Sequence, residues 1–317
     1  MQEHDQDVVV IGELNVDLIL NQLEQFPEVG KEILADNMTF TLGSSSAIFA
    51  SNLRVLGSRV SFLGKLGEDM FGRFIHAKLK DKQLHTNDII FTDSIQTGIT
   101  VALNYGEDRA MITYPGAMND LKLSDISDSA LKKGRHLHVS SIFLQEGLKK
   151  DIVPLFRKAR EMGLTTSLDP QWDPAEKWDV PWGDLLPYVD VFIPNINEIQ
   201  GITGAENLGE ALRKFSSKRH IVVVKDGSNG AHLFHGDDYL HQKAFTSPSV
   251  VDSIGAGDSF NAGFIHRYIG GSTLAECLEF AALTGAVNTV NAGGTGSFES
   301  KDKFKDLASS IFHYGVE

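Results

Sequence analysis

The segment Asp252-Ser-Ile-Gly-Ala-Gly-Asp258 places small residues between two carboxylates, directly before an apolar helical stretch. A turn of small residues that opens a helix leaves backbone N–H groups without carbonyl partners, and the helix dipole adds positive potential there. We therefore predict that the amides of Gly255, Ala256 and Gly257 form an anion hole for a phosphate group. Asp258 would lie beside that hole, where its carboxylate could accept the proton of a hydroxyl group during phosphoryl transfer. The alternative is an ordinary glycine turn with Asp258 as a favourable first-turn acid.

Two other nucleotide-binding motifs are missing. Gly64-Lys65 is followed by leucine and Gly30-Lys31 by glutamate, so the sequence has no P-loop. Gly255-Ala-Gly257 lacks a third glycine at the dinucleotide spacing, and the first expected strand leads into Gly12-Glu-Leu-Asn15. A dinucleotide-binding dehydrogenase is therefore not supported.

Polar residues after the first apolar run could bind a hydroxylated acceptor. Asn15 and Asp17 follow Val8-Val-Val-Ile11, and their side chains suit hydrogen bonds to the neighbouring hydroxyls of a sugar. The alternative is a turn in which both side chains bond their own backbone. Gly43 and Ser44, at the start of Gly43-Ser-Ser-Ser46, could bring backbone and a hydroxyl close to the same ligand.

Short β-rich apolar runs alternate with amphipathic stretches and must position these residues. We expect strands at 8–11, 60–63, 137–139, 165–168, 189–193 and 221–224. Helices are expected at 47–56, 71–82, 148–162, 196–203, 208–216, 256–269, 274–290 and 301–312. This order favours an α/β class, doubly wound, with a mostly parallel sheet flanked by helices. Neither a linker nor an internal repeat divides the chain, so we expect one domain over residues 1–317.

Two segments interrupt the alternation. Residues 14–42 and 97–115 carry strand-like patterns with turn residues and no long helix. They are expected to pair as a small antiparallel sheet that projects from the body and acts as a lid over a cleft. Arg109 lies in the second segment, where its guanidinium could bind a substrate carboxylate or phosphate, or could simply be solvated.

The bulk composition restricts the partners. The chain has 29 basic and 42 acidic residues, a formal net charge of −13 and no basic run, so we expect no nucleic acid partner. No apolar run approaches a membrane span, and residues 1–7 lack the features of a secretory signal. Cys277 is the single cysteine, so no intrachain disulfide can form, which fits a cytoplasmic protein. It lies in an apolar stretch.

The anion-binding segment resembles the second signature of the ribokinase-like, or PfkB, carbohydrate kinases, usually Asp-Thr-x-Gly-Ala-Gly-Asp. Other motifs of that family occur in the right order along nearly the whole chain: Asn15-Val-Asp17, Gly43 to Gly57, Phe62 to Gly72, Asp169-Pro170, Pro194-Asn-Ile-Asn-Glu198 and Lys225-Asp-Gly-Ser-Asn-Gly230. The resemblance implies a ribokinase-like kinase that uses ATP and Mg²⁺ to phosphorylate a hydroxyl of a small sugar.

The resemblance also implies roles for individual residues. Asn15, Asp17 and Gly43 would bind the acceptor. Asn195 and Glu198 would organise Mg²⁺ and phosphates, Glu198 through water, since Mg²⁺ keeps several waters. Capping of helix 196–203 is the structural alternative. The nucleotide pocket would be lined by Lys225, Gly227, Gly230 and Gly293. Asp252 would help to bind a monovalent cation such as K⁺, and a homodimer would form through the lid.

The sequence departs from the family pattern twice at the acceptor end. Ser44 replaces the second glycine of Gly-Gly-x-x-x-Asn, and Ile48 replaces its asparagine, which contacts the sugar in ribokinase-like members. Losing that amide puts identity as a typical ribokinase in doubt, so ribose, fructose and 2-keto-3-deoxygluconate all remain open. A nucleoside kinase, or a non-catalytic sugar-binding or regulatory homologue, is the alternative.

Two groups of ring side chains invite other interpretations. A metal site is one option for His232, His235 and His241, but their spacing fits adjacent strands around a turn, which we favour. Packing over the body near the cleft, with stacking on a ligand as the alternative, is expected for Trp172, Trp178 and Trp182.

Overall fold

The computed structural model describes residues 4–105, 108–215, 220–247 and 250–316, with backbone alone at positions 108 and 109. Its largest sheet has eight strands in the order β14-β13-β12-β11-β10-β9-β1-β4. The strands from β4 to β12 along this order pair in parallel, and β13 and β14 add an antiparallel hairpin at one edge. The bounds are β1 (Val8–Ile11), β4 (Val60–Leu63), β9 (His136–Ser140), β10 (Thr165–Asp169), β11 (Val191–Phe192), β12 (Ile221–Lys225), β13 (Ala231–His235) and β14 (Asp238–Gln242).

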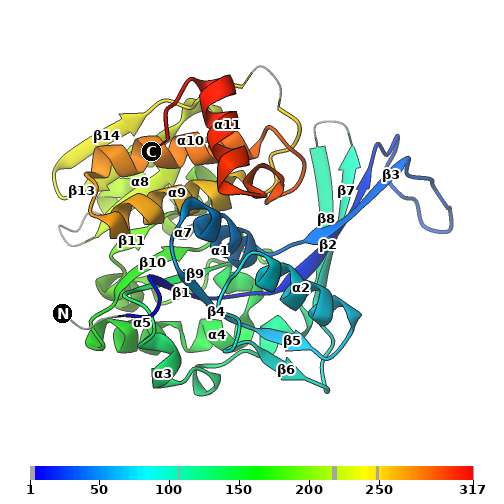
Figure 1. Ribbon diagram of the computed structural model, residues 1–317, viewed down its shortest axis with the longest axis horizontal. Helices are drawn as coiled ribbons and strands as arrows, with labels where there is room; N and C mark the ends of the chain where they lie inside the picture. The colour runs from blue at the N-terminus through cyan, green and yellow to red at the C-terminus, as the bar shows by residue number, and fades with distance from the viewer. Residues whose placement is uncertain (1–3, 106–107, 216–219, 248–249, 317) are drawn as a thin grey trace.

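Helices cover both faces of this sheet (Figure 1). Alternate residues of a buried strand point to opposite faces, so Val8 and Val10 of β1 enter one apolar core and Val9 and Ile11 the other. The first core contains side chains of α1 (Ser45–Leu56), α2 (Met70–Asp81), α9 (Ala256–Gly270), α10 (Leu274–Asn288) and α11 (Lys301–Phe312). The second contains side chains of α3 (Asp128–Leu131), α4 (Glu146–Lys150), α5 (Ile152–Glu161), α6 (Trp182–Leu185), α7 (Ile196–Thr203) and α8 (Leu208–Phe215). The predicted α/β class is confirmed.

One expected helix is divided into two. The pattern predicted a single helix over 148–162, but α4 ends at Lys150 and α5 begins at Ile152. Pro154 explains the break, because proline has no N–H to donate to the carbonyl of Lys150 and its ring would clash with that carbonyl in a continuous helix. Among the helices of the described residues, none is both long and apolar enough to cross a membrane.

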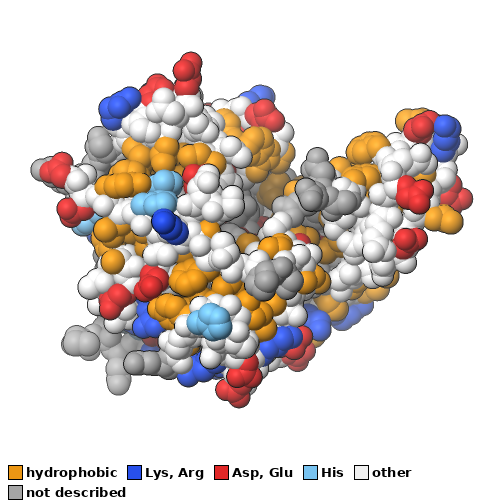
Figure 2. Space-filling model, turned by 90° about the horizontal axis from the view of Figure 1, so that it is seen from above, with side chains coloured by type: hydrophobic (Ala, Val, Ile, Leu, Met, Phe, Trp, Pro, Cys, Tyr) orange, Lys and Arg blue, Asp and Glu red, His pale blue; other side chains and the backbone are white. Residues whose placement is uncertain are grey.

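A second sheet of four strands projects from the body (Figure 1). The space-filling view shows a hollow between this arm and the body (Figure 2). Its order is β3-β2-β7-β8, with bounds β2 (Asn15–Asn21), β3 (Asn37–Leu42), β7 (Gly98–Tyr105) and β8 (Asp108–Tyr114). The prediction of an antiparallel sheet is wrong for the central pair, because β2 and β7 run parallel. These two strands are not consecutive: the chain returns through the body between them, so both leave the body in the same direction.

The register sorts the side chains of the projecting sheet onto two faces, since residues paired across strands share a face. Asn15, Asp17 and Thr100 lie on one face. The other face is apolar and contains a row of paired residues, Phe40, Leu18, Val101 and Ile112. Polar groups therefore gather on a single face of this sheet.

The remaining elements are short. A two-stranded parallel sheet consists of β5 (Lys65–Gly67) and β6 (Ile90–Thr92). The 3₁₀ helices η1 to η6 occupy Gly116–Asp120, Leu123–Asp125, Ile142–Leu144, Leu186–Tyr188, Gly227–Asn229 and Gly296–Phe298.

Members of both groups of ring side chains contact other rings of the protein. His232 and His241 are paired across β13 and β14, with ring centroids 4.8 Å apart, so the interpretation as adjacent strands is confirmed. In the described part of the chain, no group of three or more His, Cys, Asp or Glu side chains is arranged to hold a metal ion. Trp178 packs edge-on against Phe143 of the second core and against Trp172, whose side chain is 46% exposed.

Candidate active site

The turn predicted to bind an anion begins α9, as the sequence indicated. Gly255 is the N-cap with φ 73°, a left-handed conformation that favours glycine, and a Cβ there would lie 2.5 Å from the Cα of Gly294. Ala256 donates its N–H to the carbonyl of Ser253 at 3.2 Å. The amides of Gly255 and Gly257 therefore remain the candidates for binding an anion, because Gly257 in the first turn has no helical carbonyl to bond.

Asp252 ties this turn to the loop around Gly293. Its Oδ1 accepts the N–H of Ile254 at 2.8 Å, and its Oδ2 accepts the N–H of Gly293 at 2.9 Å. Gly293 thus contacts a carboxylate and is not among the residues that line the cavity described below. Binding of a monovalent cation by Asp252 stays a prediction.

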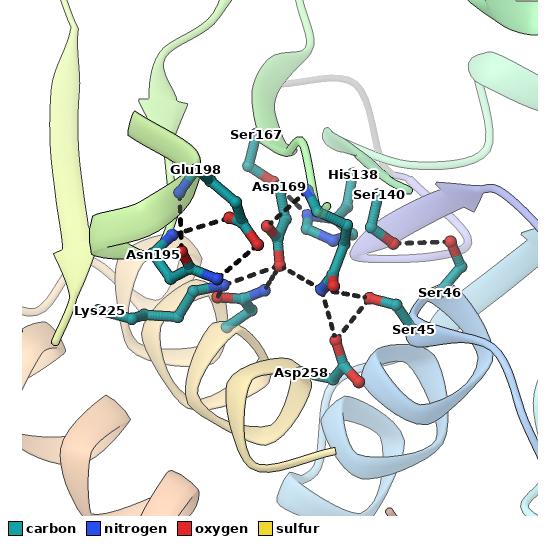
Figure 3. Close-up of polar contacts among 12 residues, drawn as sticks. Ser45, Ser46, His138, Ser140, Ser167, Asp169, Asn195, Glu198, Lys225 and Asp258 are labelled. Atoms are coloured by element: carbon teal, nitrogen blue, oxygen red, sulfur yellow. Dashed lines mark hydrogen bonds and ion pairs between the residues drawn. The ribbon is translucent and has the colours of Figure 1, made fainter. Parts of the chain in front are cut away.

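Asp258 is buried in the first turn of α9, and its hydrogen bonds converge on one oxygen (Figure 3). Oδ1 accepts the hydroxyl of Ser45 at 2.5 Å and the side-chain amide of Gln171 at 3.1 Å. Burial, helped by the charge of Asp169, raises the pKa of Asp258 to about 6, against the lowering effect of its two donors and of Lys225. A carboxylate with that pKa is mostly ionised near pH 7 and basic enough to accept a proton.

A buried ion pair lies next to Asp258 (Figure 3). Asp169 ends β10 and Lys225 ends β12, and Lys225 Nζ lies 2.8 Å from Asp169 Oδ2. The same oxygen accepts Asn261 Nδ2 at 2.5 Å and Gln171 Nε2 at 2.9 Å. Burial disfavours the charged form of Lys225, but the charges of Asp169 and Glu198 outweigh it and hold the pKa of Lys225 above its ordinary value. The carboxyl ends of β10 and β12 thus place one anion and one cation beside the Asp258 carboxylate.

Asn195 and Glu198 form a capping box at the start of α7. Asn195 Oδ1 accepts the N–H of Glu198 at 2.9 Å, and Glu198 Oε2 accepts the N–H of Asn195 at 2.8 Å. Glu198 Oε1 also accepts Asn195 Nδ2 at 2.6 Å. Burial, and next the charge of Asp169, raise the pKa of Glu198 to about 7. The structural alternative for this motif is therefore present, and its role with Mg²⁺ stays a prediction.

A cavity of about 570 Å³ opens beside the turn that begins α9. Of the predicted nucleotide and anion residues, five line it: Lys225, Gly227, Gly230, Ala256 and Gly257. Asn195 and Glu198 do not. The rest of the lining is mostly apolar or small, including Phe245, Val250, Phe260, Ala282, Gly285 and Ala286. A mostly apolar slot with a polar, glycine-rich end fits a nucleotide whose base enters the slot and whose phosphates reach the turn.

The residues that form the cavity walls were not identified from the sequence, although small residues on one face of α10 could have indicated them. Ala282, Gly285, Ala286 and Thr289 are small residues at helical spacing, which marks one face of α10 as open to close approach. Phe245 and Val250 gave no such signal, since they come from the irregular segment after β14.

The predicted acceptor residues lie at the base of the projecting sheet. Asn15 Nδ2 donates to Thr100 Oγ1 at 2.9 Å and to Asp17 Oδ1 at 3.1 Å. Gly43 lies so close that a Cβ on it would be 2.2 Å from Asp17 Oδ1. Ser44 is buried and caps α1, because its hydroxyl accepts the N–H of Ala47 at 3.0 Å and donates to the carbonyl of Glu13 at 2.6 Å. Arg109 was predicted to bind the substrate or to be solvated, and its side chain lies outside the part of the chain that the structure describes.

Ile48, which replaces the family asparagine, is buried and packs against two glycines. A Cβ on Gly294 would lie 2.4 Å from Ile48 Cδ1, and one on Gly255 would lie 3.1 Å from Ile48 Cγ2. One helical turn later, Asn52 donates to the carbonyl of Gly294 at 2.9 Å and to Ser259 Oγ at 2.8 Å. In this chain an amide therefore reaches the glycine loop from position 52, and Ile48 fills apolar space between that loop and the turn.

A buried carboxylate under α1 was also missed. Glu13 Oε1 accepts the N–H of Ser46 at 3.0 Å, and Glu13 Oε2 accepts the Ser46 hydroxyl. The Ser46 hydroxyl also lies 2.7 Å from that of Ser140 at the end of β9 (Figure 3). Burial raises the pKa of Glu13 to about 7.

Comparisons with known proteins agree with this geometry. Residues 5–301 match the pfkB family carbohydrate kinases. A ribokinase of Lactococcus lactis is 25% identical over 96% of this chain and 99% of that protein. The 5-dehydro-2-deoxygluconokinase 1 of Bacillus cereus is 26% identical over 89% of this chain and 88% of its own. The structure of Arabidopsis thaliana ribokinase complexed with ribose and ATP superposes with a TM-score of 0.81 and 25% identity, covering 95% of this chain and 98% of that one. The chain therefore belongs to the pfkB family of carbohydrate kinases, a family of phosphotransferases with the ribokinase-like fold.

Proposed function

We propose that this protein transfers the γ-phosphoryl group of ATP to a hydroxyl of a small sugar. The position of Asp258 carries the proposal. Its helix begins with Ala256 and Gly257, which line the apolar cavity, and its carboxylate bonds Ser45, which directly follows the acceptor residues Gly43 and Ser44. A base between a nucleotide-sized cavity and a polar acceptor site suits phosphoryl transfer.

In the proposed reaction the acceptor hydroxyl gives its proton to Asp258. The hydroxyl oxygen forms a bond to the γ-phosphorus while the bond from that phosphorus to the β–γ bridging oxygen breaks, which releases ADP. The amides of Gly255 and Gly257 would stabilise charge on the phosphoryl oxygens, and the ammonium of Lys225 at the polar end of the cavity would attract the phosphates. Closure of the projecting sheet over the acceptor would exclude water as a competing acceptor.

Two ions belong to this proposal. Mg²⁺ would be held mainly by the nucleotide phosphates and water, with Glu198 as the protein carboxylate nearest to that role, and would neutralise phosphate charge when bound. Carboxylate and carbonyl oxygens suit a monovalent cation, and Asp252 with its loop neighbours would supply them.

The acceptor is proposed as a small polyol of the ribose, fructose or keto-deoxygluconate class. The relatives are ribokinases and 5-dehydro-2-deoxygluconokinases, which differ in whether the named substrate carries a carboxylate. Asn15, Asp17 and Thr100 can bond the hydroxyls that all these acceptors share, and none of the three side chains carries a positive charge that would select an acceptor with a carboxylate.

The test is ADP release with ATP, Mg²⁺ and a panel of ribose, fructose, 2-keto-3-deoxygluconate, 5-dehydro-2-deoxygluconate and adenosine. We expect one sugar to give equal amounts of ADP and sugar phosphate. Asp258→Asn should lower kcat with that sugar by about 10²- to 10⁴-fold, as loss of a general base does. Asp302→Asn is a matched control, because Asp302 is also an acidic residue in the first turn of a helix, α11, and is exposed. Unchanged turnover in Asp258→Asn would contradict the role of Asp258 as the base. Turnover of adenosine and of no sugar would contradict the proposal that the acceptor is a sugar.

A further inference from the structure

Gln171 has an unusual backbone conformation beside the proposed base. It follows β10 after Asp169 and Pro170, and its φ of 58° lies in the left-handed region although it is not glycine. Such a conformation is costly for a residue with a side chain, and it persists when the surrounding structure imposes it, often at functional sites. The Gln171 side chain reaches Asp169 at the carboxyl end of β10 and Asp258 in the first turn of α9.

The side-chain amide of Gln171 lies within reach of three acceptors. Its Nε2 is 2.9 Å from Asp169 Oδ2, 3.0 Å from Ser45 Oγ and 3.1 Å from Asp258 Oδ1. An amide nitrogen carries two hydrogens, so these acceptors share two donors, and two of the three belong to buried carboxylates. One neutral group therefore separates and bridges two anionic side chains.

The bridge joins the two ends of the proposed reaction. Asp169 pairs with Lys225, and Lys225 lines the nucleotide cavity. Asp258 is the proposed base at the acceptor end. The charged groups that bear on Asp258 come from several elements: Asp169 of β10, Lys225 of β12 and Glu198 of α7.

The two carboxylate oxygens of Asp258 differ in the hydrogen bonds that they accept. Both hydrogen bonds, from Ser45 and Gln171, reach Oδ1. Within the described residues, no hydrogen bond to Oδ2 is present, so that oxygen is the one left to receive the proton of a substrate hydroxyl. Two donors on one oxygen also fix the plane of a carboxylate, which a single donor would leave free to rotate.

We propose that Gln171 is a positioning residue for phosphoryl transfer: it holds Asp258 through Oδ1 and links it to the Asp169–Lys225 ion pair, so that Oδ2 faces the acceptor. This role rests on the proposed function. The competing explanation is that Gln171 only satisfies buried polar groups, in which case its loss would weaken the fold without changing how the base titrates.

The first experiment replaces the amide with a side chain of similar shape that lacks N–H groups, in Gln171→Met. We expect kcat to fall about 10- to 100-fold with KM for ATP nearly unchanged, as for a misplaced catalytic group. The acid limb of the plot of kcat/KM for the sugar against pH should move to higher pH, because the lost donor stabilises the anionic form of Asp258.

Gln145→Met is the matched control. Gln145 is also a buried glutamine, but its amide donates to the backbone carbonyls of Ser140 and Ser141. That variant should lose stability and keep the wild-type acid limb. The positioning role is overturned if the acid limb of Gln171→Met stays where it is in the wild type, or if Gln145→Met moves it equally.

A double-mutant cycle with Ser45→Ala gives a second measure. Because Ser45 and Gln171 donate to the same oxygen, each partly compensates for loss of the other, so the double variant should lose more kcat than the product of the two single losses. Simple multiplication of the losses would overturn the shared anchoring. Failure of the proposed function is distinguished by Asp258→Asn: if that variant is inactive while the cycle is multiplicative, only the role of Gln171 is wrong.

Discussion

Glu13 is a carboxylate enclosed by hydroxyl and amide groups under the first turn of α1. Two of its contacts are with Ser46, and Ser46 lies next to Ser45, which bonds Asp258. The Glu13 carboxyl therefore fixes the turn of helix from which one donor to the base extends. Its raised pKa gives this buried group a measurable effect on stability.

The pH dependence of that effect has a definite sign. The folded protein holds the Glu13 proton to about pH 7, whereas the ordinary pKa is 4.5. Glu13 thus contributes stability that is fully present below its ordinary pKa and is lost as the pH rises through 7, by about 3 kcal/mol at most. We expect Glu13→Gln to lack this loss, so between about pH 5 and pH 8 its free energy of unfolding should fall less than that of the wild type.

Urea unfolding at both pH values measures the difference. Glu161→Gln, at the exposed end of α5, is the control and should keep the wild-type pH dependence. An equal pH dependence in Glu13→Gln and in the wild type would show that Glu13 does not titrate in this range.

Single residues differed in how well the sequence revealed them. Asp258 and its glycine turn could be predicted, because a helix start and a run of small residues are local signals. Ser45 and Gln171 could not be placed, since they reach Asp258 across 213 and 87 positions of the chain. Only the order of strands in the sheet brings such residues together. For Ile48, the sequence showed that the residue differs from the family pattern. Its packing against Gly294 could be seen only in the structure.

At the scale of elements, strands and helices were predicted well where periodicity was regular. The break between α4 and α5 and the parallel pairing of β2 with β7 were not. A proline in the third position of a helix is compatible with either a start or an interruption, and strand direction depends on the path of the connection, which periodicity does not encode.

The projecting sheet is attached to the body through aromatic contacts. Phe40 of β3 packs on Phe71 and Phe74 of α2, with ring centroids 5.7 Å and 4.7 Å apart. Phe40→Ala should cost about 1–3 kcal/mol, less than a fully buried phenylalanine because Phe40 is half-buried. We expect faster amide hydrogen exchange in β2 and β3 and a higher KM for the sugar, since Asn15 and Asp17 lie on β2.

Met38→Ala is the control for this contact. Met38 lies on the same strand and face as Phe40 but is 64% exposed, so its loss should leave exchange and KM close to the wild-type values. If both variants had the same effect, the aromatic contact with α2 would not be what holds the sheet.

At the scale of the whole molecule, the apolar face of the projecting sheet is partly exposed to solvent. Ile112 is 67% exposed and Tyr114 48% exposed on that face, and hydrophobic side chains are visible along the projecting arm in Figure 2. Exposed apolar sheet faces are stabilised when another surface covers them. We predict a homodimer in which this face packs against its copy.

A lysine on the apolar face should abolish that dimer. We expect Ile112→Lys to sediment as a monomer at concentrations where the wild type is a dimer, because the new charge would be buried at the interface. Met111→Lys is the matched control: Met111 is the preceding residue, 60% exposed, and points to the opposite face. A wild type that sediments as a monomer, or equal dissociation by both lysines, would rule out this interface.

The three tryptophans of the protein, Trp172, Trp178 and Trp182, all follow Gln171 within one short stretch of chain. The intrinsic ultraviolet fluorescence of the molecule therefore arises mostly from this one stretch, which begins directly after Gln171. Trp172 is half exposed and contacts Trp178, so its emission will respond to any rearrangement of the Gln171 turn. The wild-type protein thus carries its own optical probe of the Gln171 turn, and a stopped-flow titration with sugar that tests the proposed acceptor binding needs no added label.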